Sequence, residues 1–193
     1  MPRHRVPDRR DRILDAAEAL VLTRGFDAMS VASIAGRAGI GKGAVYLEFA
    51  GKREILDALL QRGTARMNDR VRRELGERPR LSSAYRASAR ALSEDALMTA
   101  AFLDDRGILG AHVAEVTDGR YRDRQARVVE WLRGLQNQGQ IVADADVEAL
   151  ALALSSASIG LLSAARLLGP FDPAQLERAI DTIGRMAETF ERN

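Results

Sequence analysis

Apolar residues recur every three or four positions along the chain, and no segment shows the apolar–polar alternation of a half-buried strand. The stretch from about 52 to 75 is the clearest case, because its apolar positions fall on one face of a helix. They are Leu56, Leu60, Met67, Val71 and Leu75. In the last stretch, about 173–191, the apolar spacing alternates between four and three, which is typical of helices that pack together. The pattern therefore predicts an all-α fold.

Glycine, proline and capping residues divide this pattern into separate helices. The first is expected from Asp8 to Arg24, with Gly25 ending it, and Ser30 is placed to cap a second helix over 31–37. Gly39 then makes a turn before a third helix. The remaining helices are expected at about 41–48, 52–75, 82–93, 96–103, 118–138, 145–168 and 173–191, with a poorly defined segment at 106–115.

Residues 30–49 have the pattern of a helix-turn-helix, in which two short helices flank the turn at Gly39 inside a three-helix unit. Small and apolar residues pack the two helices together: Ile34, Ala35, Ala38, Ile40, Val45 and Phe49. The outward face is left with Lys42, Gly43, Ala44, Tyr46 and Leu47. A protruding second helix is what enters a DNA major groove about 12 Å wide, where its N-terminal residues reach the bases.

This segment resembles the DNA-binding region of the tetracycline-repressor-like (TetR) family of transcriptional regulators. The resemblance covers about residues 8–60. It rests on positions that match in unbroken order: Gly25-Phe26, Ser30-Val31, Ile34-Ala35, Ala38-Gly39-Ile40, Gly43, Tyr46, Phe49, Lys52 and Leu56. A second similarity lies between Gly139 and Asp146, where such proteins commonly enter their dimerisation helices. The resemblance implies a helix-turn-helix domain over 1–52, followed over 53–193 by a helical domain for ligand binding and dimerisation.

The resemblance also implies a set of DNA-binding residues. The start of the third helix would lie deepest in the groove, where Ala44 is small enough to touch a thymine methyl group. Ser30, Ser33 and Tyr46 would bind phosphates, and Lys52 would hold the opposite wall of the groove through its charge and the helix dipole. The full set is Ser30, Ser33, Lys42, Gly43, Ala44, Tyr46, Leu47 and Lys52.

Residues beside the motif leave two alternatives open. The arginines before Ile13 form either an arm in the adjacent minor groove or a solvated basic tail. They are Arg3, Arg5, Arg9, Arg10 and Arg12. Glu48 either accepts from a cytosine amino group or points along the edge of the interface. We favour the second, because Glu48 is far from the base-reading end of its helix. Gly41 replaces the serine or threonine N-cap that the family usually has, so the third helix should lack a side-chain cap.

Composition agrees with a DNA-facing front half. The net charge of the 193 residues is only +2, but residues 1–80 hold 17 basic and 11 acidic side chains, whereas 81–193 hold 12 and 16. A basic front half favours a polyanionic partner. The absence of cysteine excludes disulfides, thiolate metal sites and cysteine nucleophiles. The N-terminus lacks the apolar core of a signal peptide, so we expect a cytoplasmic protein.

Other motifs have simpler explanations. Residues 36–43 nearly match a phosphate-binding loop but lack the strand before it and the hydroxyl after the lysine. Residues 149–165 carry no charge, but they are shorter than the ~20 residues of a membrane span and include four serines. We therefore expect a helix buried against the domain core and a partner subunit. No catalytic, metal-binding or cofactor motif is present, so we predict no enzyme, metal or cofactor.

The sequence thus predicts a sequence-specific DNA-binding transcriptional regulator that dimerises through its last two helices. We expect a repressor that a small-molecule effector releases from a palindromic operator. The helix over 52–75, about 36 Å long, would connect the DNA-binding site with the effector site. Candidates for effector contact are Phe102, His112, Trp131 and Ser158. Two alternatives remain: a ligand-independent dimeric regulator, and a small-molecule-binding helical protein whose helix-turn-helix is vestigial.

Overall fold

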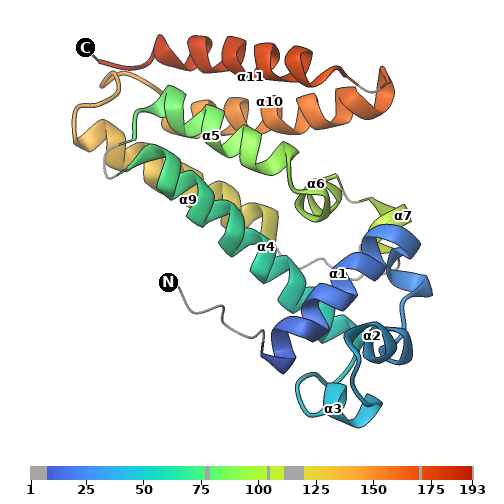
Figure 1. Ribbon diagram of the computed structural model, residues 1–193. Coiled ribbons are helices and arrows are strands. Elements are labelled where there is room, and N and C mark those ends of the chain that lie inside the picture. The colour runs from blue at the N-terminus through green and yellow to red at the C-terminus, as the bar shows by residue number, and fades with distance from the viewer. Residues whose placement is uncertain (1–7, 77–78, 104, 111–119, 170, 193) are drawn as a thin grey trace, which may run out of the picture. The chain divides into compact units, whose positions relative to one another are not determined.

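The computed structural model of the chain describes residues 8–76, 79–103, 105–110, 120–169 and 171–192, and its regular elements are helices (Figure 1). They are α1 (Arg9–Ala28), α2 (Val31–Ala38), α3 (Lys42–Tyr46), α4 (Lys52–Leu75), α5 (Leu81–Ser93), α6 (Ala96–Phe102), α7 (Arg106–Leu109), α9 (Arg120–Asn137), α10 (Val147–Leu167) and α11 (Pro173–Glu188). Within the described ranges, strand-like pairing is limited to an isolated bridge between Ile141 and Glu191. The all-α prediction is confirmed, and most helix boundaries agree with expectation to within about three residues.

The first helix is interrupted at Gly25, where the sequence predicted its end. Asp8 caps it by accepting from the Arg10 backbone N–H at 2.5 Å. Gly25, which was expected to end the helix, has a non-helical backbone with φ 76° and ψ 162°, and a further helical turn follows it to Ala28. A Cβ at Gly25 would lie 2.5 Å from the carbonyl oxygen of Gly107, so both the backbone conformation and the close approach require glycine.

The chain folds into two compact units. The first contains the residues up to Ala65 together with 96–116, and the second contains 66–95 and 117–193. The first unit is larger than the predicted DNA-binding domain over 1–52, because its apolar core takes in side chains from α4, α6 and α7. That core includes Ile13, Leu20, Ile34, Leu56, Leu59, Leu97, Ala101 and Leu109.

The second unit packs α5, α9, α10 and α11 around two apolar clusters. One cluster centres on Leu132 and Ile141, and the other on Tyr85 and Ile180. The residues after α11 fasten the loop before α10, because the Val142 backbone N–H donates to the Phe190 carbonyl oxygen at 2.9 Å. The C-terminal segment also caps α5. Its Glu191 accepts from the Ser82 backbone N–H at 2.7 Å, a favourable place for an anion.

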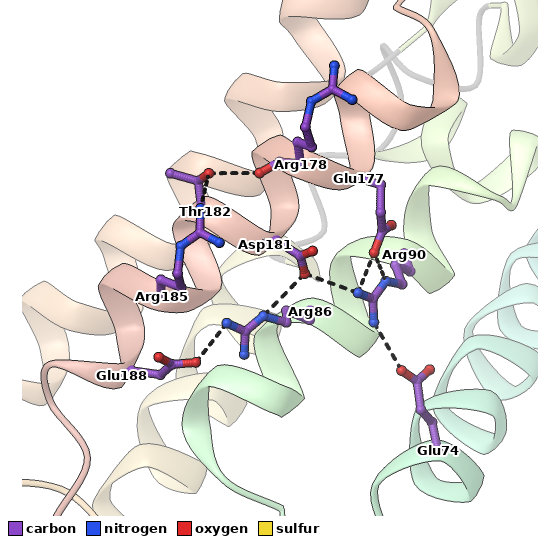
Figure 2. Close-up of polar contacts among 9 residues, drawn as sticks. All are labelled: Glu74, Arg86, Arg90, Glu177, Arg178, Asp181, Thr182, Arg185 and Glu188. Carbon is purple, nitrogen blue, oxygen red and sulfur yellow. Dashed lines mark hydrogen bonds and ion pairs between the residues drawn. The ribbon is translucent and has the colours of Figure 1, made fainter.

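Ion pairs between arginines of α5 and acids of α11 join these two helices (Figure 2). Arg90 binds Glu177 and lies 3.2 Å from an Asp181 oxygen. Arg86 binds Glu188 at 2.7 Å. Gly184 leaves space for the Arg86 guanidinium group, since a Cβ at this position would lie 2.4 Å from the Arg86 Nε. Arg90 also reaches back to α4, where Glu74 lies 3.3 Å away.

The apolar helix α10 is largely uncovered by its own chain. Its residues Val147–Ala164 have a mean hydropathy of 1.6, which by length and composition alone would suffice to cross a membrane, and 17% of them are buried. Leu152, at 61% exposed, and Ile159 lie on its open side. The sequence predicted burial of this helix against the domain core and a partner subunit; the core provides part of that cover, and the partner subunit stays a prediction. The cover from the core is partial because α5, α9 and α11 surround only part of the circumference of α10.

The Arg90–Glu177 pair predicts a contribution to stability that is lost in acid. The hydrogen bond from Arg90 holds the pKa of Glu177 below its ordinary value of 4.5. A lowered pKa in the folded state stabilises the protein above the unfolded-state pKa, and this contribution disappears as the pH falls through the folded-state pKa. Because both side chains are partly exposed, we expect an effect of at most about 1 kcal/mol.

Urea unfolding monitored by Trp131 fluorescence reports on this unit, in which Trp131 packs. Between about pH 6 and pH 3, the wild-type protein should lose more stability than Glu177→Gln. The matched control is Glu130→Gln, at an exposed position of α9, which should follow the wild type. Equal acid sensitivity of Glu177→Gln and the wild type would refute this assignment.

Candidate nucleic-acid interface

Helices α2 and α3 and the turn between them form the predicted helix-turn-helix. Ser30 and Ser33 make a reciprocal capping box at the start of α2: the Ser33 backbone N–H donates to the Ser30 hydroxyl oxygen at 3.1 Å, and the Ser30 backbone N–H donates to the Ser33 hydroxyl oxygen at 3.0 Å. Gly39 ends α2 in the left-handed region, with φ 65° and ψ 38°. The predicted cap and turn are both confirmed.

The inner face of the motif matches the sequence prediction. Ile34, Val45 and Phe49 are almost fully buried in the core of the first unit, as are Ala35 and Ala38. Of the five residues of α3, Val45 is the buried one. Gly41 precedes the helix without a side-chain hydrogen bond, as expected from its missing side chain.

The outer face is free for a partner. Lys42 and Gly43 are exposed, and Ala44 is half-buried. Tyr46 and Leu47 are 57% and 77% exposed, although aromatic and aliphatic side chains of this size are more often covered. A Cβ added at Gly43 would meet no atom within 4 Å, so the space above the start of α3 is open. The predicted set of outward residues is confirmed as a surface. Contact with DNA stays a prediction.

Lys52 makes contacts that the sequence did not suggest. Its ammonium donates to the carbonyl oxygens of Phe26 at 3.1 Å and of Asp27 and Met29 at 3.3 Å. It also lies 4.4 Å from the centre of the Phe26 ring. These three hydrogen bonds use all three N–H donors of the ammonium group. They satisfy carbonyl oxygens at the end of α1, where the helix dipole favours a cation. Lys52 thus ties the start of α4 to the end of α1, and a phosphate would have to replace one of these carbonyls.

Three of the arginines for which a minor-groove arm or a solvated tail was expected have acceptors within the protein. Arg9, Arg10 and Arg12 belong to the first turns of α1. Arg9 donates to Glu48, and Arg12 donates to backbone carbonyls at the end of α2. The tail alternative is therefore wrong for these three arginines, because they lie in the predicted helix and bind groups of the protein, whereas contact with a minor groove stays a prediction. Arg3 and Arg5 lie outside the described residues.

The candidates for effector contact occupy different settings. Phe102 ends α6 in the first unit, whereas Trp131 packs against the Leu132 cluster of the second. Ser158 lines a hollow between α5, α10 and α11, together with apolar residues such as Leu161 and Ile180. The enclosed volume of this hollow is about 10 Å³, roughly enough for one water molecule and far below the roughly 300–1,000 Å³ of typical small-molecule sites. His112 lies outside the described residues.

Tyr85 is a polar group near this hollow that the sequence did not single out. Its hydroxyl is buried and has no well-aligned hydrogen-bond partner in the described part of the chain. Burial raises the pKa of Tyr85, and the neighbouring Ser158 hydroxyl opposes this rise. Among the described residues, no group of histidine, cysteine and acidic side chains is arranged to hold a metal ion.

Residues 13–59 match the family model of the tetR family of bacterial regulatory proteins. Over 123 residues the chain is 32% identical to the HTH-type transcriptional repressor KstR of Rhodococcus jostii (strain RHA1). This match covers 61% of the chain and 57% of the relative, so little more than half of that relative is represented.

Solved structures resemble nearly the whole chain. The triclosan complex of SmeT, the repressor of the Stenotrophomonas maltophilia multidrug efflux pump SmeDEF, has a TM-score of 0.71 at 26% identity and covers 96% of this chain and 92% of its own. The ketosteroid transcriptional regulator KstR2 of Mycobacterium tuberculosis has a TM-score of 0.61 at 21% identity and covers 98% of both chains. The second likeness concerns the fold alone.

The contacts of Lys52 predict that it stabilises the first unit independently of DNA. Lys52→Met leaves three carbonyl oxygens without their charged donor, and we expect a loss of about 1.5–3 kcal/mol. Lys42→Met is the matched control, since it removes the other lysine of the chain from an exposed position.

Hydrogen exchange of the α2 backbone amides measures this effect within the first unit, whereas the single tryptophan lies in the second. Protection should fall in Lys52→Met and stay within about 0.5 kcal/mol of the wild type in Lys42→Met. Equal protection in the two variants would rule out the structural role of Lys52.

Proposed function

We propose, from the match of residues 13–59 to the tetR family of bacterial regulatory proteins, that the chain is a dimeric, sequence-specific transcriptional repressor. A small-molecule effector releases it from a palindromic operator. The observation that carries the proposal is the outer face of α3, where the exposed Tyr46 and Leu47 lie on a short helix whose opposite side is anchored in the core. Repression, rather than activation, is supported by the relatives KstR and SmeT, which are both described as repressors.

In the proposed complex, α3 lies in the major groove. Lys42, Gly43 and Ala44 face the base edges, and the absence of a side chain at Gly43 permits close approach. The exposed hydroxyl of Tyr46 binds a phosphate, and that of Ser30 does so by giving up its bond to the Ser33 hydroxyl oxygen. Ser33 and Lys52 are already engaged in contacts within the protein, so they contribute by exchanging one of these contacts for a phosphate oxygen. Leu47 adds apolar contact at the groove edge.

A second copy of the chain supplies the cover that α10 lacks. The open side of this helix presents Leu152 and Ile159, and α11 presents Met186, which is 62% exposed. Two copies of an α10–α11 pair form a four-helix interface when related by twofold symmetry. The same symmetry predicts operator half-sites roughly one helical turn, ~34–36 Å, apart or slightly more.

The proposed effector binds in the second unit and favours the conformation that does not fit the operator. The solved complex of SmeT with triclosan supports a small-molecule effector. The hollow beside Ser158 is lined almost entirely by apolar residues, which suits an uncharged compound. Because the hollow is small, the helices around it must separate to admit one.

The small hollow also favours a second candidate function, a ligand-independent regulator of the same architecture. Operator release by members of a broad compound library separates the two functions. A compound that frees the operator identifies the effector-controlled repressor. If no compound shifts the melting temperature or releases the operator, the second unit serves for dimerisation alone.

Selection of bound fragments from a genomic DNA pool, followed by gel shifts at moderate salt, tests DNA binding directly. We expect a palindromic site bound by two copies. Absence of any specific complex would favour a helical small-molecule-binding protein with a vestigial helix-turn-helix. A short asymmetric footprint from a monomer would exclude the dimeric repressor.

Substitutions on the outer face of α3 should separate phosphate binding from base recognition. Tyr46→Phe removes a phosphate contact, so it should weaken operator and unrelated DNA alike by about fivefold. Ala44→Ser adds a hydroxyl at the base edges, and it should change the preferred base at one position of each half-site by about 1–3 kcal/mol. Fluorescence anisotropy on a panel of operator variants measures both. An unchanged base preference in Ala44→Ser would remove this residue from the reading set.

Charge on the open side of α10 should dissociate the dimer. Leu152→Glu places a carboxylate in each half of the apolar interface, and it should raise the dimer dissociation constant by about 100-fold or more. Leu22→Glu on α1 is the control, since it adds the same charge at an exposed leucine of the first unit. Sedimentation velocity at several concentrations gives the constants. Equal dissociation constants for Leu152→Glu and the control would place the interface elsewhere.

A further inference from the structure

The recognition helix α3 has little intrinsic means of holding its position. It is five residues long, and isolated helices shorter than about 12 residues are marginal in water. Gly41 offers no side-chain cap at its start, and Val45 is its one buried side chain. Its orientation must therefore be fixed by groups outside the helix.

Arginines from the first turns of α1 contact the chain on both sides of α3. Before the helix, the Arg12 Nη2 donates to the carbonyl oxygens of Ala38 at 2.6 Å and Gly39 at 3.4 Å. After the helix, Arg9 donates to Glu48 Oε1 through its Nε at 2.8 Å and its Nη2 at 2.5 Å.

Arg10 reinforces the second of these contacts. Its Nη1 lies 3.4 Å from the Glu48 carbonyl oxygen, and its guanidinium carbon lies 4.3 Å from the centre of the Phe49 ring. Phe49 is buried in the core, so Arg10 lies on a fixed platform. The three arginines, Arg9, Arg10 and Arg12, are called the arginine clamp below.

The contact of Arg12 is suited to fixing the turn. Carbonyl groups at the end of a helix have no partner within it, and a cation there is favoured by the helix dipole. Gly39 adopts φ 65°, and a Cβ at this position would lie 3.4 Å from the Arg12 Nη2. The positive φ is what favours glycine here, since a Cβ would only touch the guanidinium at an ordinary van der Waals distance.

We propose that the arginine clamp positions the recognition helix, and that Arg12 acts on DNA specificity through α3 and not through a contact with DNA. The inference rests on the proposed function, because specificity presupposes an operator. It explains why an acid, Glu48, lies beside a DNA-binding helix: the carboxylate holds Arg9 at the far end of α3. Arg9, Arg10 and Arg12 are thus positioning residues.

A positioning residue and a phosphate contact differ in measurable ways. Loss of a phosphate contact weakens binding to all DNA and lowers the salt dependence, whereas base reading requires α3 to be in register with the groove. Loss of the clamp should therefore weaken operator binding while leaving the affinity for scrambled DNA nearly unchanged.

The test uses the full-length protein with the selected operator and a scrambled duplex, at several salt concentrations. We expect Arg12→Met to lower the ratio of operator to scrambled affinity by about tenfold or more, with an unchanged salt slope for scrambled DNA. Arg12→Lys should recover part of the ratio, since an ammonium still reaches one carbonyl oxygen.

Arg62→Met is the matched control. Arg62 lies in the same unit and donates to Asp15 at 2.7 Å and Glu18 at 2.6 Å, so its loss removes the same charge and leaves two acceptors without their donor, outside the helix-turn-helix. Circular dichroism establishes a temperature at which all variants are folded. At that temperature Arg62→Met should keep the wild-type ratio.

Glu48→Gln supplies a readout of opposite sign. Removal of the negative charge should strengthen binding to scrambled DNA, while release of Arg9 should lower the operator-to-scrambled ratio. If Arg9 instead binds phosphate and Glu48 merely competes for it, both affinities rise together and the ratio stays constant, which overturns the positioning role of this pair.

Two further outcomes would overturn the role of Arg12: a parallel loss of both affinities with a lower salt slope, or no change in either affinity. Hydrogen exchange of the α3 amides keeps the inference separate from the proposed function, because it needs no DNA. Faster exchange in Arg12→Met, but not in Arg62→Met, supports the clamp even for a protein without an operator. If wild-type protein binds no operator yet α3 loosens in this way, the proposed function fails and the clamp stands.

Discussion

The recognition helix buries a single side chain, and the first unit is built around this limitation. Burial of Val45 contributes about 1.5–3 kcal/mol, too little to fix both the position and the orientation of a helix. The unit adds backbone devices instead. Gly39 sets the angle of the turn, and the Ser30–Ser33 capping box fixes the start of α2. Charged donors then hold carbonyl groups at the helix ends, so polar contacts complete what the apolar core begins.

The sequence predicted these helices because their signals are local. Ser30 and Gly39 act on backbone groups within a few residues, and the apolar repeat of α4 can be recognised without its neighbours. The outward face of α3 followed from the same local pattern. The contacts of the arginine clamp did not, because Arg9 and Glu48 are 39 positions apart. Nothing in an arginine-rich stretch says whether its guanidinium groups meet carbonyl groups, acids or solvent.

Helix α10 marks a different limit of sequence reasoning. Its apolar composition correctly predicted a helix, but the single chain leaves much of its apolar surface open. The hydropathy of a helix indicates which of its surfaces should be buried, but it does not indicate which molecule buries that surface. The contacts between α5 and α11 could not be predicted from the sequence either. Arg86 and Gly184 are 98 positions apart, and only the folded chain shows that the Arg86 side chain lies against Gly184.

The first unit is built from segments that are far apart in the sequence, and this affects when it can fold during synthesis. Its core includes Leu97 and Leu109, and its α1 kink lies against the backbone of Gly107, so the unit is not contiguous in the sequence. During synthesis, the helix-turn-helix leaves the ribosome long before α7 does. At about 5–20 residues per second, several seconds pass in which part of its apolar core has no partner. Translation of the later segment therefore sets the earliest moment at which the N-terminal unit can finish folding.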